Sequence, residues 1–269
     1  MNGVKRGDLN LHLAEDGDPQ GPALVFANSL GTDLRVWDAV LPLLPRGLRI
    51  IRADKRGHGL SDDAPGPWSI EDLADDLAFA LDALEIRDAA VMGLSVGGLI
   101  AQSLAARRPD LVRVLALSGT APRIGTAESW NARIAAVEAE GIAPIAEAIL
   151  ERWFTPRFRA EDPSFAFWRN MLVRTPASGY AATCAAIRDA DLTEATAALR
   201  LPVLAMVGEA DGSTPPELVR AMAERIPGAR FEIIPDAGHI PGVEQPAVVA
   251  RLIGDFLTET GFLKETAHA

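Results

Sequence analysis

The sequence has few of the residues that form cross-links or bind structural metals. It contains one cysteine, Cys184, and four histidines among 269 residues. A single cysteine excludes an internal disulfide, and no Cys/His spacing typical of a zinc site occurs. We therefore expect neither a metal nor another cofactor, and we interpret Cys184 as a small buried apolar residue.

Long hydrophobic runs and basic clusters are also missing. No apolar stretch approaches the length of a membrane span, and residues 1–18 lack a charged and then apolar leader. The 26 basic residues against 37 acidic residues give a net charge of −11, without a Lys/Arg cluster that could follow a phosphate backbone. These features predict a cytoplasmic protein and disfavour a membrane or a nucleic acid as partner, and they leave the oligomeric state open.

Short apolar segments alternate with longer segments of helical period, which is typical of an α/β fold with a mostly parallel central sheet flanked by helices. The predicted strands span residues 23–26, 49–53, 89–92, 112–117, 202–207 and 230–234. The clearest helix begins after Ser69, where Asp72 completes a capping box. Its period places four leucines on one face that we expect to be buried: Leu73, Leu77, Leu81 and Leu84.

The strand signal disappears between about residues 122 and 192, where the sequence is alanine-rich, helical in period and contains several tryptophans. We interpret this segment as a helical cap inserted into one α/β domain. The predicted core is residues 1–121 and 196–269, and the predicted cap is residues 122–195. Because no linker-like Gly/Ser or Pro-rich run marks the borders, the cap should pack on the core.

A candidate nucleophile, Ser95, lies between Gly93 and Gly97, directly after a predicted buried strand and before an apolar helical stretch. A G-x-S-x-G sequence in this context is typical of a strained strand-to-helix turn that exposes the serine hydroxyl above the sheet. Glycines are required because the turn is tight. A simple strand-to-helix turn is the alternative interpretation.

A serine hydroxyl is a weak nucleophile and requires a base. Among the histidines, His239 follows the last predicted strand and precedes an amphipathic helix, so we predict that it is the base. His12 lies in an early strand-like segment and His58 in a glycine-rich turn, positions that favour structural roles. His268 lies in the polar C-terminal tail, which we expect to fray.

The carboxylate that orients the base is expected on a loop after a late strand. Asp211 fits, because it follows the strand at residues 202–207 and gives the chain order Ser, Asp, His. Glu209 and Asp236 remain as alternatives. A tetrahedral oxyanion also needs fixed donors, and we predict the backbone N–H groups of Leu30 and Val96.

Several of these segments resemble the 3-oxoadipate enol-lactonases of the α/β-hydrolase superfamily, and the resemblance runs nearly end to end. In the core, the similar segments are residues 28–34, 54–61 and 93–98. In the cap, they begin at Arg123, Trp130, Glu151 and Cys184. After His239, the pair Pro241-Gly242 replaces a Ser-Asn-like pair of that family.

The resemblance implies an α/β-hydrolase fold and cofactor-free hydrolysis of 3-oxoadipate enol-lactone to 3-oxoadipate in the breakdown of aromatic compounds. That substrate carries a carboxylate, so a local cation must hold it in this acidic protein. Arg133 is our candidate, with Trp130 and Trp153 as pocket walls, although a salt-bridged arginine and packing tryptophans are the alternatives. A carboxylesterase or perhydrolase on the same scaffold, and a lactone sensor with little turnover, are the rival functions.

Overall fold

A computed structural model describes residues 2–64 and 66–264. The described residues form one eight-stranded sheet in the order β1-β2-β4-β3-β5-β6-β7-β8. The strands are β1 (Asn2–Arg6), β2 (Leu9–Gly17), β3 (Ala23–Ala27), β4 (Arg49–Ala53), β5 (Ala89–Leu94), β6 (Val112–Ser118), β7 (Val203–Gly208) and β8 (Arg230–Ile234). The strands from β3 to β8 run parallel, whereas β1 and β2 form an antiparallel hairpin on the edge of β4.

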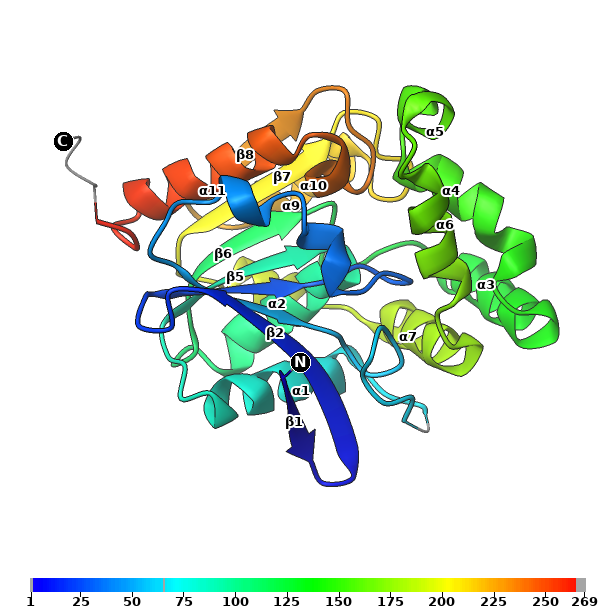
Figure 1. Cartoon of the computed structure of the whole chain (residues 1–269), viewed down its shortest axis with the longest axis horizontal. Coiled ribbons are helices and arrows are strands. Elements are labelled where there is room, and N and C mark those ends of the chain that lie inside the picture. The colour runs from blue at the N-terminus through cyan, green and yellow to red at the C-terminus, as the bar shows by residue number, and fades with distance from the viewer. Residues whose placement is uncertain (1, 65, 265–269) are drawn as a thin grey trace.

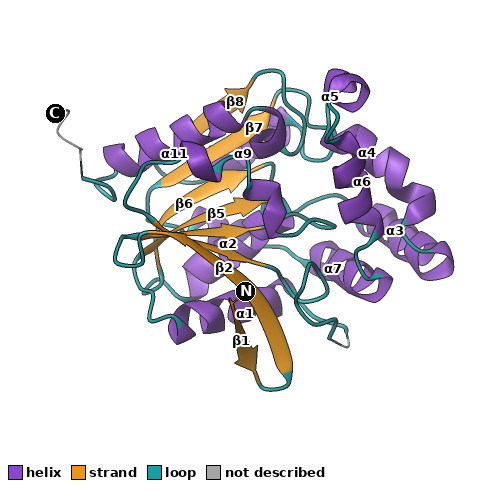
Figure 2. Cartoon of the chain, in the orientation of Figure 1, coloured by secondary structure: helices purple, strands orange, loops and turns teal. Residues whose placement is uncertain are grey.

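Helices flank the sheet and fill the insertion (Figure 2). The α-helices are α1 (Ile70–Ala83), α2 (Val96–Arg107), α3 (Ala127–Glu140), α4 (Ala146–Trp153), α5 (Pro156–Glu161), α6 (Phe165–Val173), α7 (Ala177–Asp189), α8 (Thr193–Ala197), α9 (Pro216–Ala223), α10 (Pro241–Glu244) and α11 (Pro246–Glu259). Short 3-10 helices are η1 (Leu34–Trp37), η2 (Leu41–Leu43) and η3 (Ala143–Ile145). None of the helices in the described ranges has the length and apolarity to cross a membrane.

The predicted α/β fold is confirmed, and each predicted strand is present with its ends shifted by two residues or fewer. The capping box of α1 is also confirmed, because the Ser69 hydroxyl accepts from the Asp72 N–H and the Asp72 carboxylate accepts from the Ser69 N–H. Three of the four leucines on its inner face are buried, and the last is partly buried: Leu73, Leu77, Leu81 and Leu84. The strand-like segment around His12 is confirmed as β2, whereas the edge strand β1 was not predicted, because three of its five residues are exposed.

The helical insertion between β6 and β7 is confirmed, because residues 119–202, all of which the structure describes, contain helices and no strand. Its proposed division at residues 122 and 195 stays a prediction. Figure 1 shows the arrowheads of β5, β6 and β7 pointing toward the insertion. The insertion packs closely on the core, since a Cβ atom built on Gly179 of α7 would lie 2.5 Å from the Cα of Gly57 in a core turn.

Candidate active site

Ser95 occupies the turn between β5 and α2 with a backbone φ of 57° and ψ of −118°. A positive φ is uncommon for a residue other than glycine and strains the backbone. A Cβ at Gly93 would lie 2.4 Å from the Gly97 carbonyl oxygen, and a Cβ at Gly97 would lie 2.1 Å from that of Ala27. Both distances are too short for real atoms, so this turn requires glycine where the sequence has it.

His239 and Asp211 form a buried pair on the loops that follow β8 and β7. The Nδ1 atom of His239 lies 2.9 Å from Oδ2 and 3.0 Å from Oδ1 of Asp211, and the side chains are 2% and 0% exposed. Oδ1 of Asp211 also accepts from the backbone N–H groups of Ser213 and Thr214, and Oδ2 accepts from the Thr214 hydroxyl, each at 2.8 Å. Because a carboxylate only accepts, it places the imidazole proton on Nδ1 and leaves Nε2 as the basic nitrogen.

The structure brings most of the predicted site residues into one pocket of about 90 Å³. Ser95, His239 and Leu30 line it from the core. Trp130, Arg133 and Trp153, the residues predicted to bind the substrate, line it from the insertion. No hydrogen bond joins the Ser95 hydroxyl to His239 in the described part of the chain, and in free enzymes such contacts often tighten only when the substrate binds.

The alternative acids lie elsewhere. Glu209 and Asp236 are exposed, and neither bonds to His239 among the residues that the structure describes. Asp236 adopts a positive φ of 53°, which fits its interpretation as a turn residue. The geometry therefore favours Asp211 as the partner of His239.

The backbone N–H groups of Leu30 and Val96 are available as donors. Val96 is the first residue of α2, where helix geometry leaves N–H groups without an intrahelical acceptor. Within residues 2–64 and 66–264, neither of these two N–H groups donates a hydrogen bond. The start of α2 also carries the positive end of the helix dipole, which favours a developing negative charge.

His12 and His58 have structural contacts, as the sequence indicates. His12 Nδ1 lies 2.8 Å from the carboxylate of Asp54, and His58 Nε2 accepts from the Gly31 N–H at 3.0 Å. Burial, together with the neighbouring Lys55, lowers the pKa of His58 well below its usual value, so the ring remains neutral and can accept. His268 and the end of the tail lie outside the described residues.

Arg152 and Tyr180 are among the pocket residues that the sequence analysis did not assign to the site. The phenol of Tyr180 is buried, and this burial raises its pKa. Arg152 directly precedes Trp153, and its carbonyl oxygen accepts from the Gly212 N–H at 3.3 Å, beside the Asp211 loop. That adjacency to a predicted pocket residue was the signal that could have identified Arg152.

The pocket concentrates positive charge. The guanidinium of Arg133 lies 5.0 Å from the centre of the Trp130 ring, a cation–π distance. Neither Arg133 nor Arg152 forms an ion pair with any described residue, and none of the residues that line the pocket is acidic. No cluster of His, Cys, Asp and Glu suited to a metal ion occurs in the described ranges.

Glu244 connects the insertion to the loop of His239. Its carboxylate accepts from the backbone N–H and hydroxyl of Thr155 at 3.0 and 2.6 Å, and from the Gly238 N–H at 2.7 Å. Burial raises the pKa of Glu244, and these hydrogen bonds oppose the rise. Gly242, from the pair that departs from the enol-lactonase pattern, packs toward Val40 and does not line the pocket.

Comparison with known proteins places this geometry among hydrolases. Residues 24–252 match the model of the Alpha/beta hydrolase family. The 3-oxoadipate enol-lactonase 2 of Acinetobacter baylyi is 36% identical over 240 residues, 89% of this chain and 90% of that protein. The structure of an enol-lactonase from Burkholderia xenovorans LB400 has a TM-score of 0.93 at 37% identity, covering 96% of this chain and 100% of that one. A thermophilic esterase from Thermogutta terrifontis has a TM-score of 0.89 at 31% identity, covering 96% of each chain.

Proposed function

Because this chain belongs to the alpha/beta hydrolase family, we propose that it opens a small anionic lactone, 3-oxoadipate enol-lactone, to give 3-oxoadipate. The similarity to enol-lactonases supports this substrate, and the similarity to an esterase supports the same chemistry on a simpler ester. The observation that favours the anionic lactone over a simpler ester is the positive charge of the pocket.

In this proposal the Ser95 hydroxyl attacks the lactone carbonyl while Nε2 of His239 takes its proton, and Asp211 stabilises the imidazolium. The oxyanion accepts from the N–H groups of Leu30 and Val96. Collapse of the tetrahedral intermediate then breaks the ring C–O bond. The enolate that leaves takes the proton from His239 on its carbon atom and becomes a ketone. Water activated by His239 then hydrolyses the acyl-enzyme and restores the Ser95 hydroxyl.

The pocket charge supports an anionic substrate because it opposes the charge of the whole chain. The chain carries −11, yet its Ser95 pocket contains Arg133 and Arg152 and no carboxylate. A guanidinium fork matches a carboxylate and binds it with charge-assisted hydrogen bonds. Trp130 and Trp153 are buried and would form flat walls for a small ring.

The test compares freshly generated enol-lactone with p-nitrophenyl acetate, which is neutral. Ser95→Ala should abolish turnover of both. Arg133→Met should lower kcat/KM for the lactone about 10- to 100-fold, the equivalent of losing one charge-assisted hydrogen bond, and should change ester hydrolysis little. Arg157→Met removes an exposed arginine of α5 outside the pocket and is the matched control.

Other outcomes would change the proposal in defined ways. Strong ester hydrolysis with weak lactone hydrolysis would keep Ser95 as the nucleophile and overturn the substrate. A single slow turnover with retained product would instead indicate a lactone sensor.

A further inference from the structure

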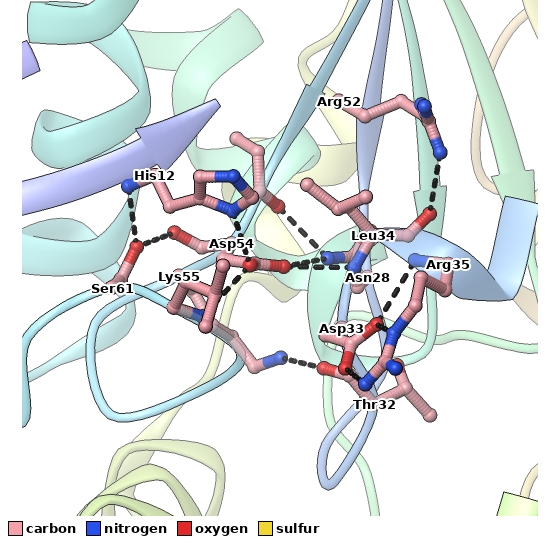
Figure 3. Close-up of polar contacts among 12 residues, drawn as sticks. His12, Asn28, Thr32, Asp33, Leu34, Arg35, Arg52, Asp54, Lys55 and Ser61 are labelled. Atoms are coloured by element: carbon pink, nitrogen blue, oxygen red, sulfur yellow. Dashed lines mark hydrogen bonds and ion pairs between the residues drawn. The ribbon is translucent and has the colours of Figure 1, made fainter. Parts of the chain in front are cut away.

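The loop that carries Leu30 is held by a buried lysine from the neighbouring loop after β4. Lys55 is 9% exposed, and its Nζ atom donates to the carbonyl oxygens of Ser29 at 2.6 Å and Thr32 at 3.3 Å. Figure 3 shows the Lys55 side chain reaching across to this loop. The lysine therefore binds the loop on both sides of Leu30.

Other polar groups of the same loop also have partners. The Gly31 N–H donates to Nε2 of His58, and the Leu34 N–H donates to Asp54 at 2.8 Å, as Figure 3 shows for Asp54. The Leu30 N–H donates to no acceptor within the described residues. Oγ1 of Thr32 also donates to the Ser29 carbonyl oxygen, at 3.0 Å. These contacts fix the loop, and the Leu30 N–H is available to the pocket that Leu30 lines.

We infer that Lys55 is a positioning residue of the oxyanion hole, acting through the Ser29–Leu30 peptide. The carbonyl that Lys55 binds and the N–H of Leu30 belong to the same peptide group. In a planar trans peptide these two bonds point in opposite directions, so holding the oxygen on Lys55 directs the N–H away from Lys55. Donation to the carbonyl oxygen also polarises the peptide and makes its N–H a stronger donor.

Burying the amino group of Lys55 costs free energy, and its role in holding the Leu30 loop explains why a lysine is present there. Burial lowers the pKa of Lys55 to about 7, although Asp54 and Asp33 favour its charged form. Removing an ammonium group from water costs free energy unless hydrogen bonds and neighbouring charges compensate for it. A lysine at this position is thus better explained by its two carbonyl contacts than by packing. The inference rests on the proposed serine mechanism and holds for any ester substrate.

The first experiment compares Lys55→Met and Lys55→Arg with wild type, using p-nitrophenyl acetate. Lys55→Met should lower kcat about 10- to 100-fold, approaching the loss of one oxyanion donor, with KM changed little. Lys55→Arg retains N–H donors and should recover part of the loss. The exposed Lys5 provides a matched control, since Lys5→Met should leave kcat unchanged. Equal kcat in Lys55→Met and wild type would overturn the inference.

A second measurement uses the wild-type protein and does not depend on the folding of a variant. Serine labelled with ¹³C at the carbonyl and leucine labelled with ¹⁵N mark two peptides in this sequence, Ser29–Leu30 and Ser103–Leu104. Phenylboronic acid, which forms a tetrahedral adduct with serine, should shift the Leu30 amide signal and leave the Leu104 signal in place. An unshifted Leu30 signal would refute the role of this N–H and of Lys55.

The ester readout separates this inference from the proposed substrate. Ester turnover without lactone turnover would overturn the lactonase proposal. The Lys55 variants would then still test the role of Lys55, because their activity is measured with the ester. A wild type that neither turns over the ester nor binds the boronate would overturn both.

Discussion

Replacing Asp211 with asparagine should disable His239 through the imidazole tautomer. Oδ1 of Asp211 accepts from two backbone N–H groups, so the asparagine oxygen must take that position. Its NH₂ group then takes the position of Oδ2, 2.9 Å from Nδ1 of His239. Because an NH₂ group donates, it places the imidazole proton on Nε2, and the nitrogen facing the pocket can no longer accept the Ser95 proton.

The expected loss in kcat is about 10⁴-fold, the size of the effect when the same change is made in another Ser-His-Asp triad. It corresponds to about 5.5 kcal/mol of activation free energy. Stability should change little, because the amide oxygen still accepts from the Ser213 and Thr214 N–H groups and Oγ1 of Thr214 can accept from the NH₂ group.

The assay is steady-state hydrolysis of p-nitrophenyl acetate and of the enol-lactone, together with a thermal unfolding curve for each variant. Asp236→Asn is the matched control, because Asp236 is exposed and follows the same strand as His239. Near-normal turnover in Asp211→Asn would refute the reasoning and would move the role to Glu209 or Asp236.

Two further predictions follow from close packing and burial. Gly97→Ala should lower the free energy of unfolding by about 3 kcal/mol or more, because the new Cβ would lie 2.1 Å from the Ala27 carbonyl oxygen. An unchanged midpoint of urea unfolding would contradict this and would show that the backbone of β3 shifts to accommodate the methyl group. Burial raises the pKa of Cys184 to about 12, so the thiol stays protonated at pH 8, and iodoacetamide should label it only after unfolding. Rapid labelling of the native protein would contradict this account.

The parts of the site that the sequence predicts well are those whose position follows from strand ends. Ser95, Asp211 and His239 each follow a recognisable apolar strand, and the carboxyl ends of parallel strands meet at one edge of the sheet. Chain order and strand signals therefore suffice to place them near one another. The glycines of the Ser95 turn are visible for the same reason, since their requirement is local.

The site residues that the sequence did not predict depend on which surfaces face each other after folding. Arg152 resembles any exposed helical arginine in the sequence, and it becomes a pocket residue only because α4 is placed beside the Asp211 loop. Lys55 sits in a glycine-rich turn that many hydrolases share, and its two acceptors lie more than twenty residues earlier in the chain. Helical period and strand alternation carry no information about such contacts.

The way the insertion sits on the core links substrate recognition to chemistry. A Cβ at Gly31, next to Leu30, would lie 2.6 Å from the Leu172 side chain of the insertion. Glu244 joins Thr155 of the insertion to Gly238, next to His239. The insertion therefore touches the loops of both the oxyanion donor and the base. Because closely packed groups transmit small displacements, substitutions at these contacts should change kcat as well as KM.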